Sequence, residues 1–314
     1  MSKPKAVAVQ SCKIALPLDF RKLDFLEFHG RDKLEFAEKV SANRLEKGLV
    51  WKGHPACLRL EFQNQAVHAD LFVDDQAISA SAAALAFLIQ RMLGLNQNIE
   101  AFVAQYHQHP QLQHLIARYP GLRVPLSASP FEAITWAITG QQISVGAATS
   151  LRRKLIQVAG VKHSSGIACY PDASRVAGLS VEDFRQAGFS NTKAQAINTL
   201  SQMVHQNQLP LDDWITDPPP VDEICERLLG VRGIGPWTVN YALLRGFGWL
   251  DGSLHGDAAV RRGLQSLLTN VKKITEVKVS EAQAQQWLAE FSPWRALVAA
   301  HLWALSAEAN DPDV

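Results

Sequence analysis

The sequence has few cysteines, no long apolar run and almost no net charge. Its four cysteines are isolated and form no Cys-x-x-Cys pair, which argues against a disulfide framework, a zinc site or an iron–sulfur cluster. We find no signal-peptide pattern and no stretch that would cross a bilayer, so a cytoplasmic protein without membrane contact is expected. The 31 Lys and Arg residues nearly balance the 30 Asp and Glu residues, so a surface for nucleic acid would have to be a local basic patch.

The first part of the chain, residues 1–98, is expected to form a small α+β domain. Residues 56–62 and 66–72 alternate apolar and polar side chains around a short Gln-Asn-Gln link, which predicts a β-hairpin with one buried face. Residues 73–93 then change to helical spacing, which Gly94 ends.

The second part, residues 99–314, is expected to be an all-helical domain. A helix over 129–140 has Ser129 as its N-cap and Pro130 at its first position, and Ser144 caps a second helix that ends at Gly160. The same signals predict further helices over 181–188, 192–206, 220–229, 257–268 and 292–309.

The stretch GVRGIGPWT, residues 230–238, follows the helix predicted over 220–229, and a second helix is expected to open with Pro236. Gly233 and Gly235 permit positive φ angles and the close approach of another chain. Their amides, with those of Trp237 and Thr238 at the start of the next helix, would form an anion site. The spacing matches neither the dinucleotide-binding fingerprint nor a P-loop. Taken by itself, the stretch is as easily a plain turn between helices.

The surrounding sequence resembles the helix–hairpin–helix DNA glycosylases, and most closely the DNA-3-methyladenine glycosylase II (AlkA) type. Residues 229–241 follow L-G-V-x-G-I-G-x-W-T-x-x-Y, and an aspartate stands sixteen residues after Tyr241. Three more segments are similar to the family's motifs, in the family's order: FEAITWAITGQQISVGAA (131–148), GFSNTKAQAINTL (188–200) and PWRALVAAHLW (293–303). The resemblance implies an all-helical HhH-GPD glycosylase core preceded by an α+β, TATA-binding-protein-like domain.

The resemblance assigns the catalytic role to Asp257. A glycosidic bond breaks through an oxocarbenium-like transition state, which a nearby carboxylate stabilises while it orients or deprotonates water. At the start of a helix, this side chain would accept amide hydrogen bonds that favour its charged form. An isolated aspartate at such a position is usually an ordinary N-cap, so the assignment rests on the family pattern. Asp251, in a turn, is a weaker candidate.

Trp237 stands where bifunctional members of the superfamily carry a nucleophilic lysine, and no lysine occurs between Gly230 and Gly263. The resemblance therefore implies a monofunctional enzyme, in which water attacks and no lyase step follows.

The resemblance also implies an aromatic base pocket formed by Trp237, Tyr241 and Trp303. A flipped, positively charged alkylated purine would stack on these rings. Gln142 takes the place of the residue that wedges into DNA, and Ala258 replaces a pocket tyrosine of the family. Phe25 or Leu26 would supply an N-terminal pocket contact.

Backbone carbonyls at Leu229, Val231 and Ile234 match those that bind a monovalent cation, Na⁺ or K⁺, in the superfamily. No cofactor is implied for the chemistry. Basic side chains that could contact phosphates stand in two groups: Arg152, Arg153 and Lys154, and Arg232, Arg261 and Arg262.

The sequence thus predicts a monofunctional DNA glycosylase of base excision repair. It would act as a monomer on double-stranded DNA, release alkylated bases such as 3-methyladenine and leave an abasic site. The alternatives are a glycosylase for oxidised or deaminated bases and a non-catalytic helix–hairpin–helix DNA-binding module. A metabolic phosphate-binding enzyme finds no support, because no strand–loop–helix signal is present.

Overall fold

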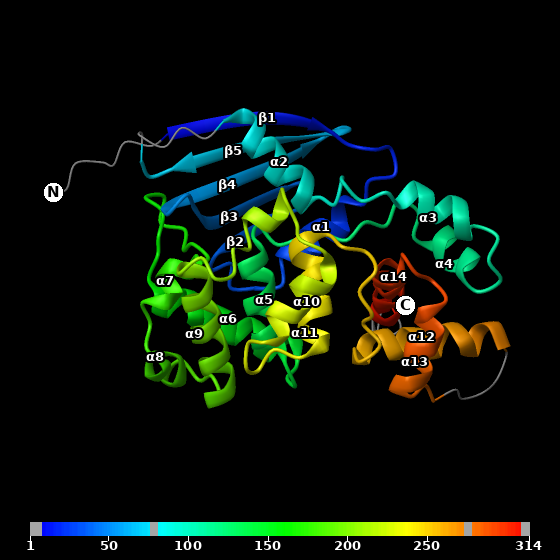
Figure 1. Ribbon diagram of the computed structural model, residues 1–314. Helices are drawn as coiled ribbons and strands as arrows, with labels where there is room; N and C mark the ends of the chain where they lie inside the picture. The colour runs from blue at the N-terminus through cyan, green and yellow to red at the C-terminus, as the bar shows by residue number, and fades with distance from the viewer. Residues whose placement is uncertain (1–7, 76–80, 273–277, 309–314) are drawn as a thin grey trace.

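The computed structural model describes residues 8–75, 81–272 and 278–308. Within these residues, an antiparallel sheet is followed by a chain that is almost entirely helical, which confirms the predicted fold class (Figure 1). No helix of the described ranges is both long and apolar enough to span a bilayer.

The N-terminal sheet has its described strands in the order β1-β5-β4-β3-β2. The strands are β1 (Ala8–Ala15), β2 (Glu38–Ser41), β3 (Arg44–Trp51), β4 (His54–Gln63) and β5 (Ala66–Val73). The predicted hairpin is confirmed as β4 and β5, with Gln63 opposite Ala66. Alternate β5 residues pack into a core with helices α1 (Lys22–His29) and α2 (Ala82–Met92).

The helix expected from residue 73 begins later than predicted. Val73 still belongs to β5, and α2 begins at Ala82, where the Ser81 hydroxyl accepts the Ala84 amide at 3.1 Å. The residues after Val73 are spaced as in a helix, which led to the earlier predicted start. Hydrogen-bonded pairing with β1 and β4, however, extends the strand as far as Val73. Residues 76–80 lie outside the described residues. Gly94, with φ of +69°, follows the helix end as predicted.

The helical elements of the rest of the chain include all those predicted from residue 129 onward, with ends shifted by a few residues. They are α3 (Ile99–Tyr106), α4 (Leu112–Arg118), α5 (Pro130–Gly140), α6 (Val145–Ala159), α7 (Ala173–Ala177), α8 (Val181–Gln186), α9 (Asn191–His205), η1 (Asp213–Ile215), α10 (Val221–Leu229), α11 (Pro236–Ala242), the π-helical turn η2 (Leu243–Phe247), α12 (Ala258–Lys272), α13 (Glu281–Ala289) and α14 (Arg295–Glu308).

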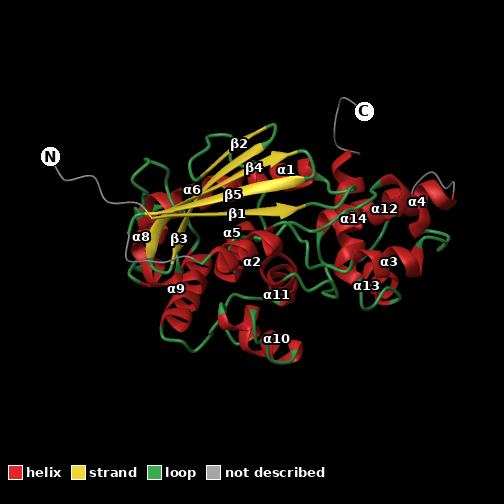
Figure 2. Ribbon diagram, turned by 90° about the horizontal axis from the view of Figure 1, so that it is seen from above, coloured by secondary structure: helices red, strands yellow, loops and turns green. Residues whose placement is uncertain are grey.

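The helices form two groups, which the views in Figures 1 and 2 both separate. One group, with α5, α6 and α9, lies below the sheet, and the other gathers α3, α4 and α12–α14 around a second core. Helix α11 belongs to both, since Val239 packs in the first core and Tyr241 in the second. The junction of the two groups therefore lies along α11, directly after the glycine stretch.

A buried ionic cluster ties the sheet to the first helical group. Lys47 on β3 donates to Glu38 on β2 at 2.6 Å and to Glu132 on α5 at 2.7 Å, and Arg152 on α6 bonds the same two carboxylates. All four residues are buried, and the two cations hold the pKa of Glu38 well below its usual range despite its burial. Arg152 is therefore a structural cation, and its predicted contact with DNA phosphate is wrong.

Candidate active site

The hairpin between α10 and α11 uses its two central glycines in different ways. Gly233 has φ of +94°, and a Cβ there would lie 2.9 Å from the Cβ of Ala196 on α9. Gly235 has φ of −108°, so of the two glycines only Gly233 adopts the positive φ that both permit. A Cβ on Gly235 would meet nothing within 4 Å, so that position leaves open space on the outside of the hairpin.

Gln141 joins this hairpin to the turn between α5 and α6. Its side-chain amide donates to the Gly233 carbonyl at 3.0 Å and to the Thr238 hydroxyl at 2.9 Å. Helix α11 begins at Pro236, so the amides of Trp237 and Thr238 lie in its first turn, where an α-helix offers no internal acceptor. The backbone donors predicted to bind an anion thus share one rigid turn.

Asp257, at the start of α12, lies at the centre of the candidate site. Its Oδ1 accepts the amides of Ala259 at 2.8 Å and Val260 at 3.1 Å, as predicted for an N-cap. The same Oδ1 accepts Nε1 of Trp303 at 3.1 Å, and Oδ2 accepts Nε1 of Trp237, also at 3.1 Å. Two indoles from α11 and α14 therefore hold the half-buried carboxylate.

The three aromatic residues predicted for the pocket lie together beside this carboxylate. The Tyr241 ring lies 5.4 Å from Trp237 and 6.2 Å from Trp303 between ring centres. Helix α14 approaches α12 closely at Gly263, where a Cβ would lie only 2.1 Å from the Leu302 carbonyl oxygen. That contact keeps Trp303 within hydrogen-bond distance of Asp257.

Gln142 lies at the tip of the turn between α5 and α6. It is exposed and has a backbone φ of +58°, which residues other than glycine rarely adopt. Two apolar neighbours are also exposed, Ile143 by 38% and Val145 by 63%. The tip is therefore free to meet another molecule, as a wedge requires.

The N-terminal pocket contact predicted for Phe25 or Leu26 is wrong. Both side chains are buried in the core between the sheet and its helices, 1% and 4% exposed. Phe28, one turn after Phe25 on α1, faces the helical core instead, where the Arg245 guanidinium lies 4.5 Å from its ring centre. The sequence of this short helix gave no signal that Phe28, rather than Phe25 or Leu26, faces the helical core.

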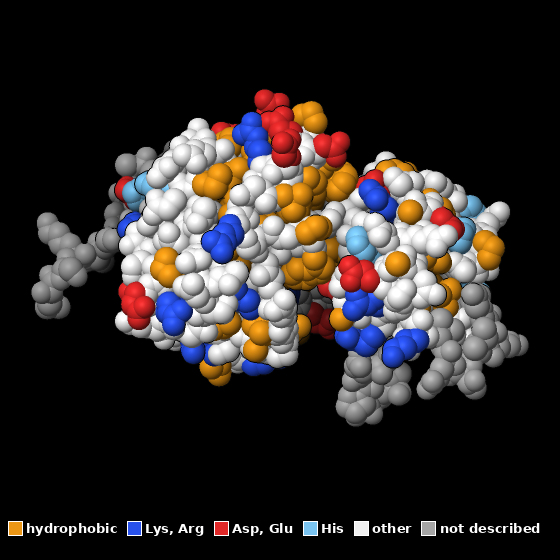
Figure 3. All heavy atoms as spheres, turned by 60° about the horizontal axis from the view of Figure 1, so that its bottom comes forward, with side chains coloured by type: hydrophobic (Ala, Val, Ile, Leu, Met, Phe, Trp, Pro, Cys, Tyr) orange, Lys and Arg blue, Asp and Glu red, His pale blue; other side chains and the backbone are white. Residues whose placement is uncertain are grey.

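Several charged residues that were considered for phosphate contact or catalysis form ion pairs or hydrogen bonds within the protein instead. The Arg153 guanidinium pairs with Asp32, Arg261 donates to the Gly256 carbonyl, and Asp251 bonds Arg295 and Ser292. Lys154, Arg232 and Arg262 remain exposed. Figure 3 shows a hollow between the two lobes, with hydrophobic side chains along its walls and Lys and Arg side chains near its rim.

Two protein-family models match the chain. Residues 135–290 match the HhH-GPD superfamily of base excision DNA repair proteins, and residues 13–129 match the AlkA N-terminal domain. The chain therefore belongs to the HhH-GPD superfamily and carries the N-terminal domain of its AlkA branch.

Individual proteins are similar to the chain in sequence or in fold. DNA-3-methyladenine glycosylase 2 of Escherichia coli is 28% identical over 194 residues, which cover 61% of this chain and 63% of the relative, so the match spans somewhat less than two thirds of that protein. The 3-methyladenine DNA-glycosylase structure from Archaeoglobus fulgidus superposes with a TM-score of 0.79 at 21% identity, over 95% of this chain and 99% of that one. The 8-oxoguanine glycosylase/lyase of Clostridium acetobutylicum, in complex with double-stranded DNA, shares the fold with a TM-score of 0.69 at 13% identity, over 98% and 99% of the two chains.

Proposed function

We propose that the protein is a monofunctional DNA glycosylase of base excision repair. It flips alkylated bases such as 3-methyladenine out of double-stranded DNA, hydrolyses the N-glycosidic bond and leaves an abasic site. The observation that carries the proposal is the Asp257 carboxylate, held by the indole N–H groups of Trp237 and Trp303 beside Tyr241. A protein that only bound DNA would need no such arrangement.

The two oxygens of Asp257 have different capacities for further bonds. Oδ1 accepts three hydrogen bonds, two from α12 amides and one from Trp303, whereas Oδ2 accepts one, from Trp237. A carboxylate oxygen has room for about two such bonds. Oδ2 is therefore the oxygen that would orient the attacking water and face the positive charge that develops on the sugar as the base leaves.

The absence of a lyase step is supported by the groups around the hairpin. Trp237 stands at the position of the nucleophilic lysine of bifunctional superfamily members, and its indole N–H donates a hydrogen bond to Asp257. Lys193 on α9 is buried, and its amine donates to the Thr139 carbonyl at 2.8 Å. Water, rather than an amine of this chain, would thus attack the sugar.

The hairpin would hold the DNA backbone. The amides of Gly233, Gly235, Trp237 and Thr238 would bind one phosphate, which can approach because Gly235 carries no side chain. The carbonyls of Leu229, Val231 and Ile234 would hold a Na⁺ or K⁺ ion, which would supply positive charge to the hairpin. No cofactor would be needed for hydrolysis. Lys154, Arg232 and Arg262 are the exposed cations that could add phosphate contacts, and the Clostridium homologue shows this fold on a duplex.

The decisive experiment presents the protein with duplexes that each carry one defined lesion and measures abasic sites. We expect release of alkylated purines, with strand breaks only after alkali. Asp257→Asn should keep lesion binding and lose about 10²–10⁴-fold in turnover, the usual contribution of a general base. Asp251→Asn is the matched control, because its carboxylate serves Arg295, and its turnover should stay within a few-fold of the parent.

Two results would contradict the proposal. Trapping of a covalent DNA complex by borohydride would show an amine nucleophile, and near-normal turnover of Asp257→Asn would remove Asp257 from the chemistry.

Replacing K⁺ and Na⁺ by a bulky organic cation at constant ionic strength should weaken DNA binding and leave the chemical step of the bound complex unchanged. A mass measured by light scattering with and without DNA tests the expected monomer.

A further inference from the structure

Arg245 places a positive charge on the ring of a tryptophan that holds the candidate catalytic carboxylate. Its guanidinium lies 5.2 Å from the centre of the Trp303 ring, within the range of a cation–π contact. The indole N–H of Trp303 donates to Oδ1 of Asp257 at 3.1 Å. The same indole therefore carries a cation on its ring and a carboxylate on its nitrogen.

Neither of these two charges is neutralised by an ion pair. Among the described residues, Arg245 has no carboxylate partner and Asp257 has no cationic partner within ion-pair distance. A charge that is partly removed from water needs compensation from the groups around it. The indole of Trp303 is the group that touches both charges, so it is where the two can stabilise each other.

The fold holds Arg245 in this place from both its backbone and its side chain. The residue lies on the π-helical turn η2, directly after the helix that carries Trp237 and Tyr241. Its Nη1 donates to the Pro125 carbonyl at 2.8 Å, and its own carbonyl accepts the Ser127 amide at 2.9 Å. Its Nε is buried and has no hydrogen-bond partner. The guanidinium is thus held by a carbonyl and by aromatic rings rather than by an acidic group.

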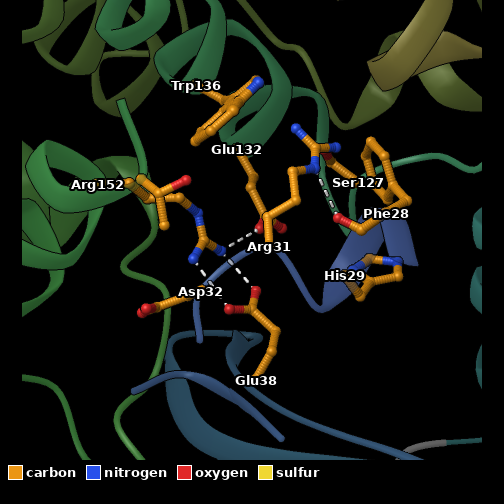
Figure 4. Close-up of a pocket in the computed structure, with 10 residues that line it drawn as sticks. Phe28, His29, Arg31, Asp32, Glu38, Ser127, Glu132, Trp136 and Arg152 are labelled. Carbon is orange, nitrogen blue, oxygen red and sulfur yellow. Dashed lines mark hydrogen bonds and ion pairs between the residues drawn. The ribbon is translucent and has the colours of Figure 1, made fainter. Parts of the chain in front are cut away.

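Phe28 on α1 provides the second ring, whose centre lies 4.5 Å from the Arg245 guanidinium. Phe28 lines a cavity between α1, α5 and α6, where the Arg31 guanidinium lies 4.1 Å from its ring centre and 4.9 Å from that of Trp136 (Figure 4). Burial lowers the pKa of Arg245 to about 10, a shift that Tyr241 opposes and Arg31 reinforces. The Arg245 side chain is therefore charged at pH 7.

A cation on an indole ring strengthens the hydrogen bond that the indole donates. The cation attracts the π electrons of the ring, so the N–H at the ring edge becomes more positive and binds an anion more tightly. Loss of the cation would weaken the bond to Oδ1 and loosen the carboxylate. Because Arg245 acts through the ring, Oδ2 of Asp257 stays available to water and to the sugar, whereas a direct ion pair would occupy it.

We propose that Arg245 is a positioning residue of the glycosylase site, whose charge on the Trp303 ring strengthens the indole hydrogen bond that orients the Asp257 carboxylate. The proposal rests on the glycosylase activity proposed above. It concerns the chemical step on every substrate rather than the choice among lesions.

The test measures the single-turnover rate and the affinity for a lesion duplex separately. Arg245→Met keeps an apolar side chain and removes the charge, and we expect a rate about three- to tenfold lower with affinity nearly unchanged, in the range of coupling within one polar network. Arg245→Gln also removes the charge but keeps a donor for the Pro125 carbonyl, so it should show the same loss even if Arg245→Met folds poorly. Arg245→Lys keeps a cation and should recover most of the rate.

A double variant shows whether Arg245 acts through the indole nitrogen. Trp303→Phe keeps a ring beside the guanidinium and removes the N–H, so adding Arg245→Met to it should lower the rate no further. Arg227→Met is the matched control, because the Arg227 guanidinium lies 5.7 Å from the ring centre of Trp214, a tryptophan that does not bond the carboxylate. Its rate should equal that of the parent.

The possible results are distinct. Losses that add in the double variant would show that Arg245 does not act through the Trp303 nitrogen, and a slow Arg245→Lys would show that the charge is not what matters. An unchanged or faster rate in Arg245→Met and Arg245→Gln would also overturn the proposal, the faster rate because the cation would then oppose the positive charge on the sugar. Failure of the wild-type protein to release any lesion base would instead refute the glycosylase function itself.

Discussion

Trp303 donates the N–H of its indole to Oδ1 of Asp257 at 3.1 Å across 46 residues of sequence, and Trp237 donates to Oδ2 at the same distance. The two tryptophans therefore fix the carboxylate in place from two helices, in addition to the pocket walls that we propose them to form. The indole nitrogen bonds the carboxylate, whereas the indole ring is available for stacking, so a substitution that removes only the nitrogen can distinguish the two roles.

Trp303→Phe should lower kcat about tenfold or more and leave lesion binding nearly unchanged. The phenyl ring still stacks, but the carboxylate loses a hydrogen bond to a charged group, typically worth about 1.5–3 kcal/mol. Single-turnover rates and equilibrium binding to a lesion duplex measure the two effects separately. Trp294→Phe removes an indole bond to Gln105 elsewhere and should change neither quantity. A loss of binding without loss of rate would show that Trp303 acts only by stacking.

Gly233→Ala and Gly235→Ala should affect different properties, the first variant losing stability and the second losing DNA affinity. Gly233→Ala strains a backbone at φ of +94° and crowds Ala196, so the free energy of unfolding should drop by more than about 1 kcal/mol. Gly235→Ala meets open space and should leave stability within about 0.5 kcal/mol. Its new methyl group would stand where phosphate is proposed to approach, so DNA affinity should fall. Chemical denaturation and DNA titration on both variants give the answer, and unaltered DNA affinity of Gly235→Ala would place the phosphate elsewhere.

Gln142→Gly should impair base flipping without loss of stability. Glycine accepts the φ of +58° more readily than glutamine, so the fold gains or keeps stability while the duplex loses the side chain that would fill the gap. The fluorescence of 2-aminopurine beside a lesion reports the flipped state. Asn207→Gly, at another left-handed position after α9, is the control and should flip bases normally. Full flipping by Gln142→Gly would assign the wedge to a neighbour such as Ile143.

Stability should fall as the pH drops from 6.5 towards 4 because of His301 on α14. Burial lowers the pKa of this histidine from 6.5 to about 4, so in that range only the unfolded chain takes up its proton. The stabilisation is complete above pH 6.5, and about 3 kcal/mol of it is lost by pH 4. Urea denaturation at several pH values measures the slope. His301→Leu should flatten it, whereas His107→Gln, at an exposed position, should not.

Local signals account for most of what the sequence predicted. Ser129, Ser144 and Gly160 cap helices as expected, because a cap depends on residues within one turn. The tryptophans and Tyr241 were predicted around Asp257 from a family pattern, and the structure brings them together. The hydrogen bonds of the two indoles to the carboxylate could not be predicted from the spacing of these residues.

Contacts between distant segments show why the remainder was not predictable. Arg31 and Trp136 are more than a hundred residues apart, one in the turn after α1 and the other on α5. Arg152 looked like part of an exposed basic run, and only the fold brings Glu38 and Glu132 to it. Charges that face each other across a core have no fixed separation in sequence.

The ionic cluster of Lys47, Glu38, Glu132 and Arg152 has a consequence for the way this chain can be divided. Removing the sheet would leave Glu132 and Arg152 without two of their partners in a buried place, and breaking a buried pair costs about 3–5 kcal/mol. We therefore expect that the helical part does not fold as an autonomous fragment. We expect calorimetry on the whole protein to show a single melting transition, in which the β-sheet and helices α5 and α6 unfold together.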